Sequence, residues 1–337
     1  MSEIRQDRAT KRWVVLATER AKRPHDAVKR SEAAPEPEYS PDCPFCPGNE
    51  DKTPAEVLAL RSPGSEPNGP GWQVRVFANR FAALRPEGEV RVENPEWFTS
   101  ITGVGIHDVI VEHPHHNETP ATMTPGEMLL VFEVLSQRFA QLAGDRRLAY
   151  LALFRNQGVT AGSSLHHPHA QLIGTPIVPT HVRQELTTAR EFYDDAVCCV
   201  YCATMQHELA DGRRVVLDND HYCAFTPYAS RWPFETWIVP KHHEPVVVFD
   251  DRFDTESFAR TLQSVLRMLY LGAGNPDYNL VLHQAPLRDS CEDYYHWHME
   301  IVPRLSTPAG FEFGTGIWIN TVMPEEAAPY LRSFAGQ

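Results

Sequence analysis

The sequence lacks several features that would assign the protein to a special class. No apolar run approaches the roughly 20 residues needed to cross a bilayer, which argues against a membrane protein. No apolar segment follows the N-terminal residues, so a secretory signal is missing and we expect a cytoplasmic protein. The seven cysteines are therefore interpreted as thiols or metal ligands, because disulfides are rare in that compartment.

Basic residues are also scarce. The 337 residues include 31 Lys and Arg against 44 Asp and Glu, which gives a net charge of -13. A broad nucleic-acid surface needs clustered basic side chains, so this balance argues against one. A phosphate on a small ligand would have to meet a local basic group. Arg20 and Arg23, with Lys22 between them, form such a group.

Histidine, in contrast, is abundant, and its 16 copies mark an internal repeat. Each half contains, in order, a Cys-x-x-Cys pair, strand patterns, a histidine group, a long amphipathic helix, another strand and a His-x-His motif. The helices are predicted from Thr124 to Gly144 and from Asp254 to Gly272. We predict an α+β fold of two duplicated units, residues 1–180 and 181–337, each with an antiparallel sheet and one long helix.

The repeat predicts two metal sites. Zinc takes four tetrahedral ligands from thiolates and imidazoles, and a Cys-x-x-Cys pair supplies two of them. The predicted ligands are Cys43, Cys46, His116 and His167 in the first site and Cys199, Cys202, His243 and His296 in the second. The long separations indicate structural ions that tie distant strands together. The alternative is a set of ordinary buried thiols and histidines.

A candidate nucleophile follows in the first half, in the run His167-Pro168-His169-Ala170-Gln171. Strand alternation places residues 167, 169 and 171 on one face. A neutral histidine can attack phosphorus when its other ring nitrogen donates to a fixed acceptor such as a backbone carbonyl. Gln171 could donate to a phosphate oxygen, and Ser163 and Ser164 lie in a preceding Gly/Ser turn that suits phosphate.

The second half has an equivalent histidine, His298, in its own His-x-His motif. Three carboxylates, Glu292, Asp293 and Glu300, lie close to it in the sequence. Because they would repel a phosphate, we expect the chemistry in the first half.

These motifs together resemble the galactose-1-phosphate uridylyltransferase family of the histidine-triad superfamily. The similarity covers most of the chain. It includes Arg20 to Pro24, the first Cys-x-x-Cys pair, Asn79 to Leu84, Phe154 to Asn156, the run from His167 to Gln171, and His296 with His298.

The resemblance implies a ping-pong nucleotidyltransferase with a covalent nucleotidyl-histidine. His169 would be the nucleophile, and Gln171 with Ser163 or Ser164 would hold the transferred phosphoryl group. Asn79 and Asn156 would lie near the nucleotide, and Arg20 and Arg23 near phosphates. The substrates would be a nucleotide sugar and a sugar 1-phosphate or phosphate. A homodimer is also implied, with the site completed by the neighbouring subunit near Phe311.

The sequence differs from the uridylyl-transferring members of this family at two places. One concerns the ligands of the second metal, and the other concerns the base of the nucleotide. Uridylyl-transferring members place a Glu and three His at that metal, which Glu185, His283, His296 and His298 could match. The second Cys-x-x-Cys pair instead resembles the plant-type adenylyl-transferring branch, and it favours zinc over iron. The run from Gly310 to Gly316 also resembles that branch, because Thr315 and Gly316 stand where the uridylyl branch has a Tyr-Glu pair.

Four functions therefore remain open. The function we expect is UDP-glucose–hexose-1-phosphate uridylyltransferase of galactose metabolism, and the first alternative is an adenylyltransferase or ADP-sugar phosphorylase with the same mechanism. The third is a non-catalytic zinc protein that binds nucleic acid. The fourth is a triad-type hydrolase, which Gln171 in place of the third histidine disfavours.

Overall fold

One antiparallel sheet runs through the protein in the computed structural model, which describes residues 2–22, 36–94, 96–247 and 254–337. Its strands within the described residues are β3 (Glu56–Arg61), β4 (Trp72–Ala78), β7 (Ile106–Val111), β8 (Tyr150–Gln157), β9 (His169–Thr175), β10 (Val215–Asp218), β11 (Tyr222–Phe225), β12 (Thr236–Pro240), β13 (Tyr278–His283) and β14 (His298–Pro303). Their spatial order is β10-β11-β12-β14-β13-β8-β9-β7-β4-β3.

The order of these strands shows the predicted duplication. From one edge inward the first half contributes β3-β4-β7-β9-β8, and the second half contributes β10-β11-β12-β14-β13. In each half one long helix comes between the third and fourth of these five strands along the chain, α1 (Pro125–Ala143) and α4 (Thr255–Ala273). The predicted fold class is confirmed. The two sheets are not separate, however, because β8 and β13 pair and join them into one. The division at residue 180 stays a prediction.

Both long helices start where their caps predict. Thr124 and Glu127 form a reciprocal capping box at the start of α1, and Asp254 accepts the Ser257 backbone N–H at the start of α4. The predicted end of α4 at Gly272 is wrong. The helix ends at Ala273 and is capped by Gly274, which has φ +67° and adopts the left-handed cap conformation. Gly272 instead allows close packing, since a Cβ there would lie 3.0 Å from the Phe334 ring.

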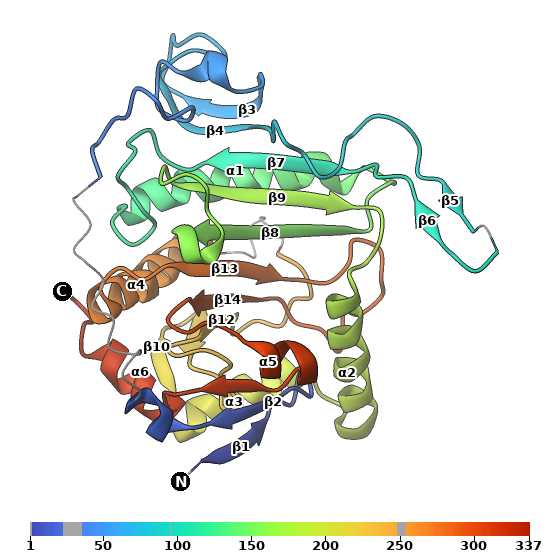
Figure 1. Ribbon diagram of the computed structural model, residues 1–337, viewed down its shortest axis with the longest axis vertical. Helices are drawn as coiled ribbons and strands as arrows, with labels where there is room; N and C mark the ends of the chain where they lie inside the picture. Colours follow the sequence, from blue (N-terminus) through green and yellow to red (C-terminus); the bar gives the residue numbers. More distant parts are fainter. Residues whose placement is uncertain (1, 23–35, 95, 248–253) are drawn as a thin grey trace.

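The two faces of the sheet have different neighbours. Helices α1 and α4 pack on one face, over buried side chains such as Val76, Leu172 and Ile238. On the opposite face of the second half lie α2 (Thr180–Ala196) and α3 (Val200–Asp211), packed on Phe225 and Trp237. Figure 1 shows α1 behind β7, β9 and β8, so that the opposite face of the first half is turned toward the viewer.

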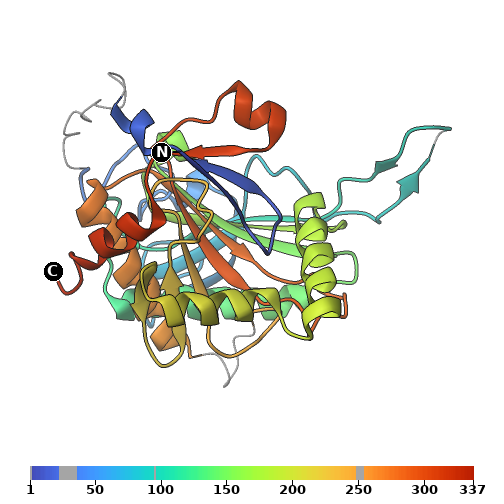
Figure 2. The ribbon, with the colours of Figure 1, turned by 90° about the horizontal axis from the view of Figure 1, so that it is seen from below.

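Smaller elements complete the fold. A small sheet of β1 (Glu3–Gln6), β2 (Trp13–Leu16) and β15 (Trp318–Asn320) lies across the large sheet from α1 and α4 (Figure 2). The remaining elements are the hairpin β5 (Val92–Glu93) and β6 (Ser100–Ile101), the helices α5 (Gly310–Thr315) and α6 (Pro324–Arg332), and the 3-10 turns η1 (Thr18–Lys22), η2 (Glu50–Lys52) and η3 (Val159–Ala161). Of the helices described, none combines the length and apolar character needed to cross a membrane.

Candidate active site

The four predicted ligands of the first metal site come together beside the β9 strand. Cys43, Cys46, His116 and His167 are all buried, and their ligand atoms lie within 4.8 Å of one another. The Cys46 Sγ is 3.6 Å from His116 Nδ1 and 3.5 Å from His167 Nδ1. Around a tetrahedral zinc ion with ordinary bond lengths, a sulfur and a nitrogen are about 3.5 Å apart. The residues therefore fit such an ion.

The surroundings of this cluster orient its donors. His167 Nε2 is 2.8 Å from the His113 carbonyl, so Nε2–H donates there and leaves the Nδ1 lone pair facing the sulfurs. The backbone N–H groups of Ser40 and Phe45 donate to Cys46 Sγ and Cys43 Sγ, which suits thiolates. Burial lowers the pKa of His167 to about 3, so its ring is neutral as a ligand must be.

The second predicted site has ligand distances similar to those of the first, but its cysteines lie at the start of a helix. Cys199 caps α3 and Cys202 lies in its first turn, whereas Cys43 and Cys46 lie in a turn outside any regular helix. The Cys202 Sγ is 3.1 Å from His243 Nδ1 and 3.4 Å from His296 Nδ1. The two Nδ1 atoms are 3.3 Å apart, close to the roughly 3.4 Å expected between two imidazole ligands of tetrahedral zinc. This cluster could also hold a metal ion.

His296 thus faces the cysteines, which leaves the alternative set of Glu185, His283 and His298 without it. His283 lies between two buried carboxylates, with Nδ1 3.2 Å from Glu185 and Nε2 3.3 Å from Glu300. Burial opposes a charge on His283, but the two carboxylates outweigh it and raise its pKa to about 10. Arg231 also pairs with Glu300. This cluster therefore has its own cations.

His169, the predicted nucleophile, is the first residue of β9 and is held in one orientation. Its Nδ1 is 2.8 Å from the backbone carbonyl of His167, which is the fixed acceptor that the sequence could not name. Nδ1–H donates to that oxygen, so the lone pair is on Nε2. Burial lowers the pKa of His169 to about 4, and the ring is neutral at pH 7. The Phe45 ring packs edge-on against it, with 5.3 Å between centroids.

The Gly/Ser turn lies beside this strand and is fixed by the second half of the chain. The Asp277 carboxylate accepts from the Thr160 N–H and hydroxyl at 2.8 and 2.6 Å. Gly158, at φ +81°, has no room for a Cβ against Asp277. The Ser163 hydroxyl is buried and donates to Leu165, whereas the Ser164 side chain is exposed. Of the two serines, Ser164 is the one available to a ligand.

The two predicted nucleotide-side asparagines lie on the same face as His169. The Asn156 amide oxygen accepts from Asn279 Nδ2 at 2.8 Å, so its own NH₂ group points away from that contact. The Asn79 amide oxygen accepts from the Phe81 N–H at 2.9 Å. Sequence reasoning missed Asn279 and also His107, whose Nε2 is 2.8 Å from Gln171 Oε1. Both lie on strands next to β8 or β9, and only the strand register identifies them.

Two predicted substrate-binding residues, Arg20 and Phe311, lie on elements apart from the strand that carries His169. Arg20 is exposed on η1, which follows β2, and Phe311 is 45% exposed on α5, which packs against β15. Both elements adjoin strands of the small sheet, since η1 follows β2 and α5 precedes β15. Arg23 lies outside the described residues.

Comparisons with known proteins settle the family. Residues 1–179 match the model for the N-terminal domain of galactose-1-phosphate uridyl transferase, and residues 174–332 match its C-terminal domain. The chain belongs to the galactose-1-phosphate uridyl transferase family. The family resemblance seen in the sequence is confirmed, and the protein is a nucleotidyltransferase.

Curated relatives of the transferase fall into two groups. ADP-glucose phosphorylase of Arabidopsis thaliana is 35% identical, covering 98% of this chain and 92% of the relative. Galactose-1-phosphate uridylyltransferase of Thermotoga maritima is 26% identical, covering 98% of each. Among solved structures, the Arabidopsis ADP-glucose phosphorylase with bound ADP-glucose superposes with a TM-score of 0.82 and 30% identity, over 100% of both chains.

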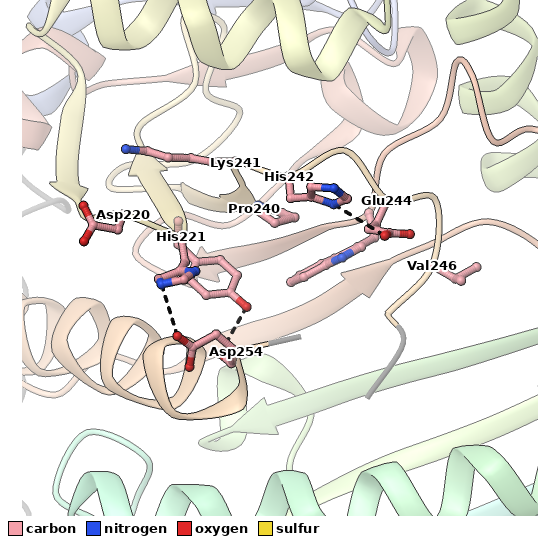
Figure 3. Close-up of a pocket in the computed structure, with 10 residues that line it drawn as sticks. Asp220, His221, Pro240, Lys241, His242, Glu244, Val246 and Asp254 are labelled. Atoms are coloured by element: carbon pink, nitrogen blue, oxygen red, sulfur yellow. Dashed lines mark hydrogen bonds and ion pairs between the residues drawn. The ribbon is translucent and has the colours of Figure 1, made fainter. Parts of the chain in front are cut away.

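The transferase also has a cavity of about 90 Å³ in its second half, shown in Figure 3. It lies between β11, β12 and the start of α4. Several of its polar side chains pair with one another, His221 with Asp254 and His242 with Glu244. None of the predicted catalytic residues lines it, so we do not connect this cavity with nucleotidyl transfer.

Proposed function

We propose that this protein transfers an adenylyl group from an ADP-sugar to inorganic phosphate or a sugar 1-phosphate, through a covalent intermediate on His169. The single observation that supports this mechanism best is the hydrogen bond from His169 Nδ1–H to the His167 carbonyl. It leaves an uncharged nucleophilic nitrogen in a fixed direction, next to a phosphate-type loop.

The chemistry proceeds in two displacements. The lone pair of His169 Nε2 attacks the α-phosphorus, and the bond from that phosphorus to the bridging oxygen breaks. The sugar 1-phosphate leaves with the bonding electrons. An oxygen of the acceptor phosphate then attacks the same phosphorus, and His169 leaves as a neutral imidazole because Nδ1 keeps its proton, which stays hydrogen-bonded to the His167 carbonyl throughout.

Neutral donors suit the charge that develops on the phosphoryl oxygens. Gln171 lies two residues after His169, and side chains at this spacing along a strand share a face. Its amide and the exposed Ser164 hydroxyl would stabilise the oxygens without competing as acids. Asn156 and Asn79 would contact the nucleotide.

Two observations favour an ADP-sugar over a UDP-sugar as the donor. The relative named ADP-glucose phosphorylase shares 35% identity, against 26% for the Thermotoga uridylyltransferase. The second cluster also uses the paired cysteines that resemble the adenylyl branch. UDP-glucose and a hexose 1-phosphate remain the second candidate substrates, because the matching family models are those of galactose-1-phosphate uridyl transferase.

We propose that each cluster of two cysteines and two histidines holds one zinc ion. A bound ion would neutralise the thiolates and fix His167, whose carbonyl in turn orients His169. The role of the metal is structural.

We also propose a homodimer in which Arg20, Arg23 and Phe311 complete the active site of the partner subunit. The placement of Arg20 on η1 and of Phe311 on α5, rather than beside β9, supports this arrangement. Mixing an Arg20→Ala protein with a His169→Ala protein should restore activity in mixed dimers that contain one intact site. Two inactive variants that stay inactive after subunit exchange would contradict the proposal.

The mechanism is tested by intact-protein mass spectrometry. Incubation with ADP-glucose and no acceptor should add one adenylyl mass per chain, and His169→Ala should abolish the addition. His166→Ala, at an exposed neighbouring histidine, is the matched control and should still be labelled. Labelling that persists in His169→Ala, or no labelling by either ADP-glucose or UDP-glucose, would refute the assignment.

The same samples address the other functions. Release of free AMP without an acceptor would indicate a hydrolase, whereas phosphate-dependent release of ADP indicates a phosphorylase. A filter-binding assay with nucleic acid tests the non-catalytic interpretation, for which the net charge of -13 is unfavourable.

A further inference from the structure

A histidine that has no role in the reaction described above lies next to Gln171. His107 is on β7 and pairs with Ile173 of β9. Gln171 is two residues before Ile173 on β9, so its side chain lies on the same face of the sheet as that of His107. Its two ring nitrogens have different partners. Nδ1 is 3.0 Å from the backbone nitrogen of Ala83, and Nε2 is 2.8 Å from Gln171 Oε1.

These partners fix the tautomer of His107. A backbone N–H can only donate, so Nδ1 must accept from Ala83 and has no proton. The single ring proton is therefore on Nε2, and the ring is neutral. Nε2–H donates to Gln171, which must present its oxygen to the histidine. The Gln171 NH₂ group is then directed away from His107.

We propose that His107 is a positioning residue that fixes the amide of Gln171, so that its NH₂ group rather than its oxygen meets the phosphoryl group transferred by His169. This inference rests on the proposed function. An amide that could flip would present an oxygen to a negatively charged phosphate for part of the time, and that orientation repels the transition state.

The same proton has a consequence for Asn79. Asn79 Nδ2 lies 3.1 Å from His107 Nε2, but a protonated nitrogen cannot accept from it. The Asn79 amide oxygen is occupied by the Phe81 N–H. Its hydrogens therefore stay available to a ligand. His107 thus sets the direction of the Gln171 amide and takes no hydrogen from Asn79, whose own direction is set by the Phe81 N–H.

Two variants of His107 separate positioning from simple packing. The amide nitrogen of His107→Gln can replace Nε2–H, whereas the amide of the shorter His107→Asn lies near the place of Nδ1 and preserves only the contact with Ala83. We expect single-turnover labelling by ADP-glucose to slow less than about 5-fold in His107→Gln. In His107→Asn it should slow about 10- to 100-fold, below the loss for a deleted transition-state donor.

A double variant tests whether His107 acts through Gln171. Gln171→Ala and His107→Asn/Gln171→Ala should be labelled at the same rate, because the amide that His107 orients is absent from both. Multiplicative losses would show that His107 acts separately and would overturn the inference. Equal losses in His107→Gln and His107→Asn, together with equal decreases in thermal midpoint, would show a merely structural role.

A spectroscopic measurement keeps the inference testable if a variant does not fold. In ¹⁵N-histidine-labelled wild-type protein, His107 should have a protonated Nε2 and an unprotonated Nδ1. The opposite tautomer or a doubly protonated ring would overturn the inference. Wild-type protein that is not labelled at all, or His169→Ala that still is, would refute the proposed function instead. Normal labelling dependent on His169 without coupling between His107 and Gln171 refutes only this inference.

Discussion

Replacing His283 by Gln should destabilise the protein strongly and should leave its metal content unchanged. His283 is the cation between Glu185 and Glu300, and all three side chains are buried, with 5%, 1% and 3% of their surfaces exposed. Removing one partner of a buried ion pair leaves an uncompensated charge, which typically costs about 3–5 kcal/mol. Glu300 retains Arg231, so the cost falls mainly on Glu185.

The pH dependence gives this prediction its sign. The pKa of His283 is about 10 in the folded protein, above the value of about 6.5 in an unfolded chain. Its stabilising contribution is therefore complete below pH 6.5 and is lost as the pH rises toward 10. The largest possible slope is about 1.4 kcal/mol per pH unit, which gives a loss of at most about 2.7 kcal/mol between pH 7 and pH 9.

Urea unfolding at several pH values measures both effects. The difference in unfolding free energy between wild type and His283→Gln should shrink as the pH rises from 7 to 9. His221→Gln is a matched control, because His221 also pairs with a carboxylate but its side chain is 54% exposed. That exposed pair should contribute less than about 1 kcal/mol.

Two results would refute this reasoning. A wild-type advantage that stays constant with pH would show that His283 is not the charged partner of Glu185. Loss of one bound metal per chain in His283→Gln would show that the cluster is a metal site, since a ligand histidine must be neutral.

Two further predictions concern the metal clusters and the nucleotide side. Cys199→Ser should reduce bound zinc from about two ions to about one per chain by elemental analysis; an unchanged content would contradict the second cluster as a site. Asn279→Ala removes the donor to both Asn156 and the Ala161 carbonyl. It should raise the KM for the nucleotide sugar about 10-fold, as expected for about 1.4 kcal/mol of binding, and an unchanged KM would show that Asn156 does not need this orientation.

The sequence predicted the features that depend on local signals or on the repeat. The capping residues predicted where α1 and α4 begin, and the repeated motifs predicted that both halves have the same succession of strands and helix along the chain. The edge strands β3 and β10 were not predicted. The start and end of α2 were not predicted, and the reason is physical. Its cap is Pro179, which has no side-chain hydrogen bond to offer, and it ends at Val197, a non-glycine residue with φ +55°. Neither residue is a typical helix signal.

The candidate site could likewise be predicted only where the residues themselves carry a signal. The Cys and His groups could be chosen from spacing, because residue type restricts metal ligands to a few kinds. The acceptor for His169 is a backbone carbonyl, and every residue has one, so no sequence signal distinguishes His167. His107 and Asn279 act from neighbouring strands, and their positions depend on a register that residue patterns leave undetermined.

The proposed location of the chemistry in the first half has better support than the repulsion expected from acidic neighbours. Glu300 lies beside the equivalent histidine, His298, but Arg231 and His283 already balance its charge. The two histidines differ in the side chains that pack on them. The Tyr201 ring of α3 stacks on His298 at 4.7 Å, and His283 stacks on it at 4.8 Å. His169 has the edge of Phe45 beside it instead, on the face turned away from α1. The duplicated unit therefore presents two neutral histidines, and the packing of α3 closes one of them to any phosphate.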